Sequence, residues 1–366
     1  MISKALVVGA YHQKLVELTK LGIDVHVVIP KSWGHQFPEI TKGNGYSIHF
    51  LPVYLSGENH FHFYSDLKKT VQSVRPDVLH IDEEPYSVVT YQAMRLAKGY
   101  SISSLFFTWQ NIYKRYPFPF SWFEIYNYSH ASVAIAGNNE ALNVLQRKGF
   151  AKEIFVIPQF GVDLCLYTRR DSSALKRELF SSSEAGVIGY VGRLVEEKGI
   201  MDLIEAFSKV KRNIYLLIVG NGPLEHRISV RAAQLDILKR VKIIPHVPSD
   251  RIPEYLNVMD CLVLPSRTRT TWKEQFGRVL IEAMACEVPV VGSTSGEIPH
   301  TIGNAGLLFE ESNIDDLYQK ISLILSNSQL KKQLRHEGRR RVGERFTQRH
   351  IAAQTLEVYK KILQEN

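Results

Sequence analysis

Short apolar runs alternate with amphipathic helical patterns along most of this 366-residue chain, and this alternation constrains its fold more than any other feature. Each apolar run ends in a turn and is followed by apolar residues at helical spacing. The pattern predicts an α/β fold with parallel sheets covered by helices on both faces. In the first half we expect strands at residues 5–8, 25–29, 78–81, 101–108, 131–136 and 153–157. In the second half we expect strands at residues 186–191, 214–219, 241–244, 261–264 and 289–291.

Polar, turn-forming residues at 165–185 interrupt the alternation and predict a linker between two domains. We expect an N-terminal Rossmann-like domain at residues 1–165 and a C-terminal one at residues 166–347. The last helix, at about 348–366, is expected to pack back on the N-terminal domain. In doubly wound sheets ligands bind beyond the carboxyl ends of the strands. A cleft between the two facing domains is therefore the expected active site.

Composition excludes several classes of protein. Hydrophobic residues make up 45% of the chain and charged residues 22%, which excludes a wholly disordered polypeptide. No apolar run reaches the roughly 18 residues of a membrane-spanning helix. The three cysteines lack metal-ligand spacing and are too few for a disulfide framework, so we expect a metal-free protein of the reducing cytoplasm. A position at the inner face of the membrane stays open.

The formal net charge of +8 favours acidic partners such as nucleotide phosphates and anionic lipid headgroups. No nucleic-acid-binding module is recognisable, so nucleic acid is not an expected partner. The densest basic run, from Lys331 to Arg341, follows a helical pattern and is interpreted as a solvated helix face.

A first motif joins the strand at 186–191 to the next helix. Gly192 allows a phosphate to approach the backbone closely, Arg193 offers a planar fork of donors, and Lys198 adds a mobile positive charge. These residue types suit a diphosphate. The alternative interpretation of the same residues is a tight strand–helix turn with two solvated cations.

A second motif contains two glutamates, Glu274 and Glu282, separated by seven residues. Glu274 precedes a helical pattern at 277–285, and Glu282 lies four residues after Arg278 on one face of that helix. Two carboxylates beside a phosphate are unfavourable unless they bind hydroxyl groups. The motif therefore suggests one glutamate for a hexose and the other for a ribose.

With these motifs the chain resembles the retaining glycosyltransferase family 4, whose members have the GT-B architecture of two facing Rossmann-like domains. The resemblance covers most of residues 186–310 and includes Gly220-Asn221-Gly222-Pro223 and Pro265-Ser266-Arg267. It implies that Gly192, Arg193 and Lys198 contact the donor diphosphate and that Glu282 holds the ribose. It also implies that the transferred sugar is held by Glu274 and by the backbone amides of Phe276, Gly277, Arg278 and Val279. The family needs neither a metal nor a cofactor, because arginine and lysine neutralise the diphosphate.

The chain departs from the family pattern in four places. Only Gly-Ala-Tyr-His at 9–12 stands where a glycine-rich loop is usual, and Trp109 follows the strand after which the family often has a histidine. His246 replaces a common glycine near the expected base pocket. His300 replaces a frequent glutamate and is interpreted as structural.

Candidate acceptor-side residues follow two strands of the N-terminal half. They are His80, Asp82, Trp109, Gln110, Asn111, Lys114 and Arg115. The aromatic stretch at 106–128 suits a sugar-stacking or membrane-interface surface. A plain polar cluster at a strand end and ordinary aromatic packing remain the alternatives.

The expected function is that of a retaining hexosyltransferase without metal. It would move a sugar from a nucleotide diphosphate sugar, with a UDP-sugar favoured over a GDP-sugar, to a hydroxyl of a glycan, lipid-linked or small-molecule acceptor. Peripheral contact with a membrane stays open. Two alternatives remain: a nucleotide-sugar epimerase on the same fold, and a nucleotide-sugar-binding regulator without catalysis.

Overall fold

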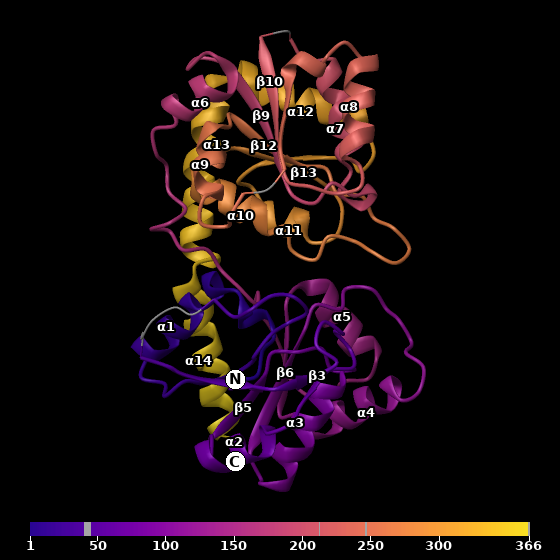
Figure 1. Ribbon diagram of the computed structural model, residues 1–366, viewed down its shortest axis with the longest axis vertical. Helices are drawn as coiled ribbons and strands as arrows, with labels where there is room; N and C mark the ends of the chain where they lie inside the picture. Colours follow the sequence, from indigo (N-terminus) through magenta and orange to yellow (C-terminus); the bar gives the residue numbers. More distant parts are fainter. Residues whose placement is uncertain (40–44, 212, 246, 365–366) are drawn as a thin grey trace. The chain divides into compact units, whose positions relative to one another are not determined.

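The computed structural model describes residues 1–39, 45–211, 213–245 and 247–364, and it divides the chain into two compact units (Figure 1). Unit 1 comprises Met1–Gly161 with Gln348–Asn366, and unit 2 comprises Val162–Thr347. The segment at 165–185, which we predicted to be a linker around a short helix, belongs to unit 2, and its helix is α6 (Ser173–Phe180). Phe180 is buried against Tyr215, which fixes α6 to the sheet of unit 2.

A parallel sheet forms the core of unit 1. Strands β1 and β2 pair with each other, and β5, β6, β7 and β8 pair in that order. Ile2 joins the two parts, because it pairs in parallel with both Val28 and Ile81. The strands are β1 (His26–Pro30), β2 (Ser47–Leu51), β5 (Val78–Ile81), β6 (Ser103–Thr108), β7 (Val133–Ala136) and β8 (Ile154–Val156), with a short hairpin of β3 (Val53–Tyr54) and β4 (Phe63–Tyr64).

The strand predicted at 5–8 is wrong, because two 3₁₀ turns, η1 (Ala5–Val7) and η2 (Gly9–Tyr11), occupy this segment. The place of a first strand is filled by Ile2, whose N–H donates to the carbonyl of His80 and whose carbonyl accepts from the N–H of Asp82, both at 2.9 Å. Leu6 and Val7 are buried in a cluster with residues of helix α1. Their apolar character therefore serves packing and not strand pairing.

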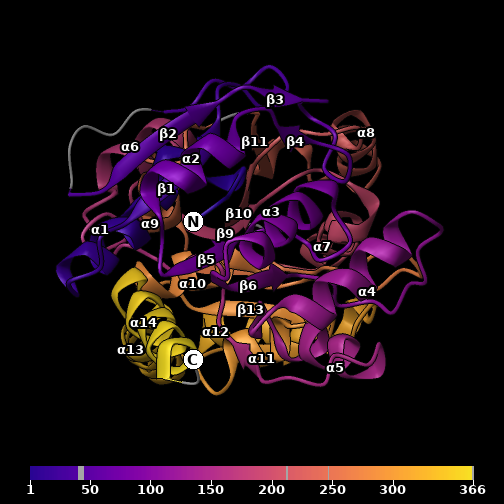
Figure 2. The same cartoon turned by 90° about the horizontal axis from the view of Figure 1, so that it is seen from below.

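Helices cover the sheet of unit 1. They are α1 (Gln13–Lys20), α2 (Leu67–Val74), α3 (Val88–Gly99), α4 (Phe120–His130), α5 (Asn139–Arg147) and α14 (Gln348–Gln364). Asn138 is the N-cap of α5, because its side chain accepts from the N–H of Ala141 at 2.7 Å. Helix α14 packs beside α1 in both views (Figures 1 and 2) and buries Ile351 and Val358 against residues of β6 and β7.

Unit 2 is built on a six-stranded parallel sheet with the order β11-β10-β9-β12-β13-β14. The strands are β9 (Gly186–Val191), β10 (Ile214–Val219), β11 (Val241–Ile244), β12 (Cys261–Leu264), β13 (Val290–Ser293) and β14 (Leu307–Phe309). The strand order reverses between β9 and β12. Such a switch point lies where the loops after neighbouring strands diverge and leave room for a ligand.

Helices lie on both faces of this sheet, with α7, α8 and α12 on one side and α6, α9, α10 and α13 on the other (Figure 1). Their bounds are α7 (Ile200–Ser208), α8 (Glu225–Gln234), α9 (Ile252–Val258), α10 (Arg278–Ala285), α11 (Ile298–Ile302), α12 (Ile314–Ser326) and α13 (Ser328–Arg345), with 3₁₀ turns η3 (Glu196–Lys198) and η4 (Leu238–Arg240). None of the helices in the described ranges is long and apolar enough to cross a bilayer.

Asp260 ties the amino ends of β9 and β12 to two helices. Its carboxylate accepts from the N–H of Val187 at 3.0 Å and contacts the ammonium groups of Lys176 and Lys331. Burial alone would raise the pKa of Asp260, but the two lysines and the amide outweigh burial and hold this pKa below its ordinary value. The ionised carboxylate therefore stabilises the folded state.

We expect Asp260→Asn to lower the free energy of unfolding by about 1–3 kcal/mol at neutral pH, because the two lysines lose a charged partner. A depressed pKa gives stability that is fully present above the unfolded-state pKa of about 3.9 and is lost as the pH falls through the folded-state value. The variant and the wild type should therefore converge in acid. Urea unfolding at pH 7 and about pH 3 measures this, with exposed Asp250→Asn as the control. An equal loss at both pH values would contradict the assignment.

Candidate functional site

Two glycines bring the loops after β9 and β10 together at the carboxyl edge of the sheet in unit 2. Gly220 has φ +147°, and a Cβ built on it would lie 1.9 Å from the carbonyl oxygen of Gly192. The N–H of Gly192 donates to the carbonyl of Val219 at 3.0 Å. No side chain fits at Gly220, so the two loops pack against each other through their main chains.

Lys198 and Glu274, 76 residues apart in sequence, form an ion pair at the same edge. The Lys198 ammonium lies 2.6 Å from Oε2 of Glu274, and the Ser266 hydroxyl donates to this same oxygen at 2.7 Å. The ammonium also lies 5.0 Å from the centre of the Trp272 ring. The structure thus joins two of the predicted site residues and adds Ser266, which the motif alone did not assign to the site.

Glycines hold this pair in place. Gly199 has φ +65°, and an added Cβ would lie 1.8 Å from the carbonyl oxygen of Pro265. Gly296 packs in the same way against the carbonyl of Glu274, which also accepts from the N–H of Glu297 at 3.1 Å. Close backbone contact therefore fixes both ends of the ion pair.

The segment after Glu274 leads into helix α10. Phe276 is anchored by its carbonyl, which accepts from the Thr301 hydroxyl at 2.7 Å, and Gly277 reverses the chain with φ +75°. Arg278 and Val279 then open the helix. The first turn of a helix carries amides without an intrahelical acceptor and a partial positive charge, which suits an anion or a sugar oxygen.

Glu282 is 8% exposed, and its carboxylate lies 2.8 Å from Nε of Arg278 on the preceding turn. The Tyr167 hydroxyl is its second hydrogen-bond partner. Burial raises the pKa of Glu282, while Arg278 and Tyr167 act in the opposite direction. Tyr167 lies in the segment misread as a linker, so no motif pointed to it.

Arg193 stands apart from this pair. Its side chain is 65% exposed and lies 3.7 Å from the carboxylate of Glu197. The carbonyl of Arg193 accepts from the buried Tyr190 hydroxyl at 2.7 Å, so the backbone is anchored while the side chain extends into solvent.

On the predicted acceptor side, His80 and Asp82 lie inside unit 1 and not at an exposed rim. His80 is 2% exposed, contacts the Tyr359 hydroxyl at 2.7 Å, and has its pKa held well below the ordinary value by burial. Asp82 accepts from the hydroxyl of Ser3 at 2.7 Å and from the amide of Gln159 at 2.9 Å. These contacts agree with a polar cluster packed at the strand ends.

The residues after β6 are partly packed and partly exposed. Trp109 donates from its indole to Gln159 at 2.9 Å, and its ring covers Gly137, where an added Cβ would be 2.3 Å away. The side chain of Gln110 accepts from Lys148 at 3.2 Å, and that of Asn111 donates to Glu140 at 3.2 Å. Lys114 and Arg115 are exposed.

Two histidines, His246 and His300, were named above as departures from the family pattern. His246 lies outside the described residues. His300 is exposed and lies 3.7 Å from the carboxylate of Glu297. Among the described residues, no three His, Cys, Asp or Glu side chains are grouped as metal ligands would be. The expectation of a metal-free reaction stays a prediction.

Two family models match successive parts of the chain. Residues 171–341 match the model described as glycosyl transferases group 1, and residues 12–165 match the one described as glycosyltransferase family 4. Among curated proteins, N-acetyl-alpha-D-glucosaminyl L-malate synthase of Bacillus anthracis is 30% identical over 59% of this chain and 55% of its own length. The capsular polysaccharide biosynthesis glycosyltransferase CapM of Staphylococcus aureus is 35% identical over 49% and 47%. The chain thus spans about half the length of these relatives.

Solved structures share the whole fold. A glycosyltransferase from Rickettsia africae has a TM-score of 0.77 with 21% identity, covering 100% of this chain and 98% of its own. Anabaena HepE in complex with UDP has a TM-score of 0.74 with 18% identity and 96% coverage of both chains. At these identities the likeness establishes the fold, which is GT-B.

The contacts of Glu282 predict its effect on stability. Glu282→Ala removes the partner of both Arg278 and the Tyr167 hydroxyl and should cost about 1–3 kcal/mol of unfolding free energy. Glu282→Gln keeps the shape and most hydrogen-bonding capacity, so its cost should be smaller. Denaturant unfolding of both variants measures the difference. An alanine variant as stable as the wild type would contradict the contacts described here.

Proposed function

The chain belongs to glycosyltransferase family 4, and from this premise we propose a retaining transfer of a hexose from a nucleoside diphosphate sugar to an acceptor hydroxyl, without a metal or cofactor. The observation that carries the proposal is the Lys198–Glu274 ion pair at the carboxyl edge of the sheet in unit 2. A cation and a carboxylate held together there suit a ligand that brings both an anion and hydroxyl groups. A nucleoside diphosphate sugar has this chemistry.

The proposed roles follow from charge. Lys198 and Arg193 bind the diphosphate with the help of the glycine backbone at Gly192, and the first turn of α10 adds amide donors. The side chain of Glu274 accepts hydrogen bonds from hydroxyls of the transferred sugar. In the folded protein Glu274 is the counterion of Lys198, and an entering diphosphate would share or take over that charge.

The reaction exchanges one bond to the anomeric carbon for another. The bond from that carbon to the diphosphate oxygen breaks, and the acceptor oxygen forms its bond on the same face. The acceptor hydroxyl proton passes to the departing diphosphate oxygen, so no separate base is needed. Lys198, Arg193 and the helix amides stabilise the negative charge that grows on the leaving group.

The proposed ribose site is Glu282. Its carboxylate is buried between Arg278 and the Tyr167 hydroxyl, which fix its direction. A fixed carboxylate that accepts from both hydroxyls of a ribose is a recurring device in nucleotide-binding folds.

The relatives support the choice of donor and the class of product. HepE was solved in complex with UDP-glucose, and two curated relatives are named GDP-mannose-dependent mannosyltransferases. We therefore favour a UDP-sugar and keep a GDP-sugar as the second option. CapM is named for capsular polysaccharide biosynthesis, whereas the Bacillus anthracis relative is named for the small molecule L-malate, so we keep a glycan, a lipid-linked and a small-molecule acceptor as options.

An aromatic surface on unit 1 supports a membrane-borne acceptor. Phe118 is 81% exposed, Ile125 is 67% exposed and Trp122 is 45% exposed, and Lys114 and Arg115 precede them in the chain. Apolar rings flanked by cations suit the interface of an anionic membrane. We propose peripheral membrane contact through this segment.

The test of the function is a panel of UDP- and GDP-sugars with and without membrane lipids. Release of nucleoside diphosphate together with a new glycoside supports the proposal, and proton NMR of the first product should show the donor's anomeric configuration. Conversion of the donor sugar into its epimer, without release of nucleoside diphosphate, would indicate an epimerase. Binding without either reaction would indicate a regulator.

Lys198→Met should lower kcat by roughly 10²–10³, the typical effect of losing one preorganised charge at a leaving group. The matched control is Lys209→Met, which removes an ion-paired surface lysine of the same unit. Steady-state rates with the active donor measure the effect. Equal rates for the two variants would contradict the role of Lys198.

Replacing both Lys114 and Arg115 by alanine should raise the apparent KM for the acceptor and leave donor affinity unchanged, because the proposed donor contacts all lie in unit 2. The control pair is Lys68→Ala with Lys69→Ala, two exposed lysines of α2 in the same unit. Parallel shifts in donor and acceptor parameters would mean that the segment only supports the fold.

A further inference from the structure

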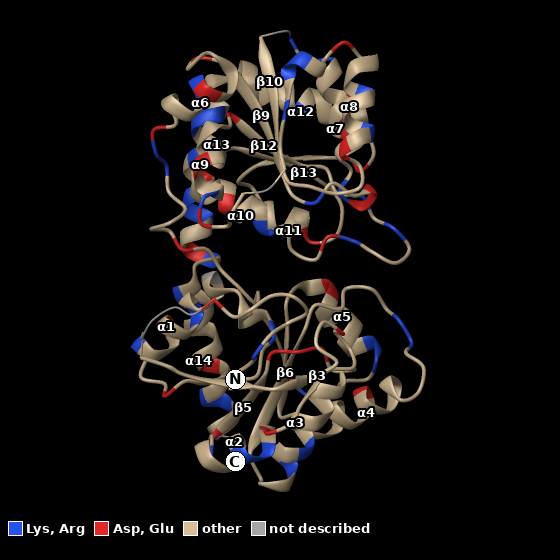
Figure 3. Cartoon of the chain, in the orientation of Figure 1, with Lys and Arg blue, Asp and Glu red and all other residues tan. Residues whose placement is uncertain are grey.

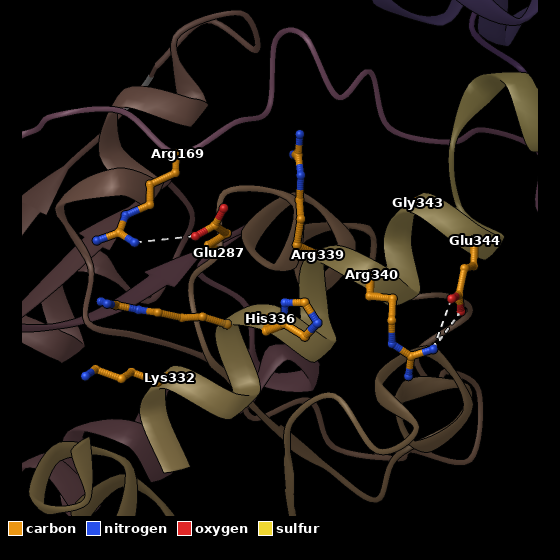
Figure 4. A pocket seen from close by; sticks show the side chains of 9 residues that line it. Arg169, Glu287, Lys332, His336, Arg339, Arg340, Gly343 and Glu344 are labelled. Carbon is orange, nitrogen blue, oxygen red and sulfur yellow. Dashed lines mark hydrogen bonds and ion pairs between the residues drawn. The ribbon is translucent and has the colours of Figure 1, made fainter. Parts of the chain in front are cut away.

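The basic run on α13 is not a simple solvated face. Lys and Arg recur along α13 and near α6 (Figure 3). Part of the run lines a cavity of about 590 Å³ together with Arg169 and Glu287 (Figure 4). Five cationic side chains face two carboxylates there. The cations are Arg169, Lys332, Arg335, Arg339 and Arg340, and the carboxylates are Glu287 and Glu344.

The two carboxylates are already occupied. Glu287 lies 3.4 Å from Arg169, and Glu344 lies 3.0 Å from Arg340, at opposite ends of the cavity (Figure 4). Arg339 donates to backbone carbonyls, at 2.5 Å to Ala285 and 2.7 Å to Tyr167. These carbonyls carry no net charge, so the positive charge of Arg339 is not neutralised.

Lys332 and Arg335 form no ion pair with any residue in the described part of the chain. Nε of Arg335 is buried and has no hydrogen-bond acceptor there. Burial and the neighbouring Arg169 both lower the pKa of Arg335. Asp260 and Glu287 act in the opposite direction without forming an ion pair with Arg335, so a bound anion would give this guanidinium a direct partner.

The cavity is separate from the site at the Lys198–Glu274 pair. A second cavity of about 400 Å³ shares Arg169, Glu287 and Arg335 with it. That second cavity reaches Asp260 and Val288, which precede β12 and β13. The basic pocket therefore continues along the amino edge of the sheet in unit 2, whereas Gly192, Ser266 and Lys198 belong to the carboxyl edge.

We propose that this pocket binds a phosphate-bearing ligand, with Arg335 and Lys332 as its principal contacts. The planar fork of a guanidinium matches two phosphate oxygens, and the lysine adds a mobile charge to a third. Two neighbouring cations, Lys332 and Arg335, that form no ion pair within the described ranges favour a phosphate dianion over a single carboxylate. The phosphate could belong to a soluble molecule or to a phospholipid headgroup, since both present the same chemistry.

The binding probe is inorganic pyrophosphate, titrated by calorimetry into the 366-residue chain carrying Lys198→Ala, which weakens the donor site. Adding Lys332→Gln and Arg335→Gln should raise the Kd at least about tenfold, as expected for lost hydrogen bonds to a charged group. The matched control adds Lys239→Gln and Arg345→Gln, which remove one exposed lysine and one exposed arginine of unit 2 outside the pocket. The control should bind as the parent does.

Folding is checked by thermal denaturation. Because Nε of Arg335 has no acceptor in the described structure, its loss should not lower the Tm of the pocket variant. A second arm measures co-sedimentation with phosphatidylglycerol vesicles, with phosphatidylcholine vesicles as the blank. Binding of pyrophosphate that depends on the pocket assigns a soluble phosphate ligand. Binding of anionic vesicles alone, with the same dependence, assigns a headgroup. Equal binding by the pocket and control variants in both arms overturns the proposal.

Discussion

A half-buried ion pair between Lys198 and Glu274 joins the loops at the carboxyl edge of the sheet in unit 2. Lys198 ends the 3₁₀ turn η3 after β9, whereas Glu274 and Ser266 both lie in the loop between β12 and α10. Withdrawing two charges from water costs more than their attraction returns unless further hydrogen bonds satisfy them. An ion pair is therefore a poor choice for stability alone. The ion pair lies at the carboxyl edge of a doubly wound sheet, where ligands bind in such folds, so its two charges are placed where a ligand could contact them.

The surrounding backbone is shaped around this pair. Gly199 and Gly296 each pack against a carbonyl group closer than any other residue could. Helix α10 is fixed at both ends, by the Thr301 hydroxyl on the carbonyl of Phe276 and by Arg339 on the carbonyl of Ala285. The rigid helix carries Glu282 between these anchors. Arg339 also donates to the carbonyl of Tyr167. Helix α13 therefore contacts both α10 and the segment that carries Tyr167, and it lines the basic pocket as well.

Regular periodicity was a reliable guide in unit 2 and a poorer one in unit 1. The strands at 186–191, 214–219, 241–244 and 261–264 were predictable because each is a continuous apolar run between turn residues. The first strand of unit 1 was not, because Ile2 alone pairs and the more apolar residues after it are needed for packing. Helices α3 and α4 were not predicted. The buried residues of α3 do follow helical spacing, whereas the aromatic residues of α4 hide its periodicity.

The motif residues of the candidate site were predictable, but their partners were not. Glu274, Glu282 and Lys198 stand in recognisable patterns, whereas Ser266 and Tyr167 join them only through tertiary contact. Burial likewise cannot be inferred from a single polar residue. His80 ends a strand in the sequence, and only the packing of Tyr359 from the distant helix α14 shows that it is enclosed.

In the proposed reaction Lys198 and Glu274 separate, so that Lys198 binds the diphosphate and Glu274 binds the sugar of the same ligand. A crystal structure of the protein with the nucleoside diphosphate sugar that it consumes tests this most directly. We expect the Lys198 ammonium within hydrogen-bond distance of the diphosphate and the Glu274 carboxylate within hydrogen-bond distance of sugar hydroxyls. A diphosphate bound elsewhere, with the 2.6 Å contact between Lys198 and Glu274 unchanged, would contradict it.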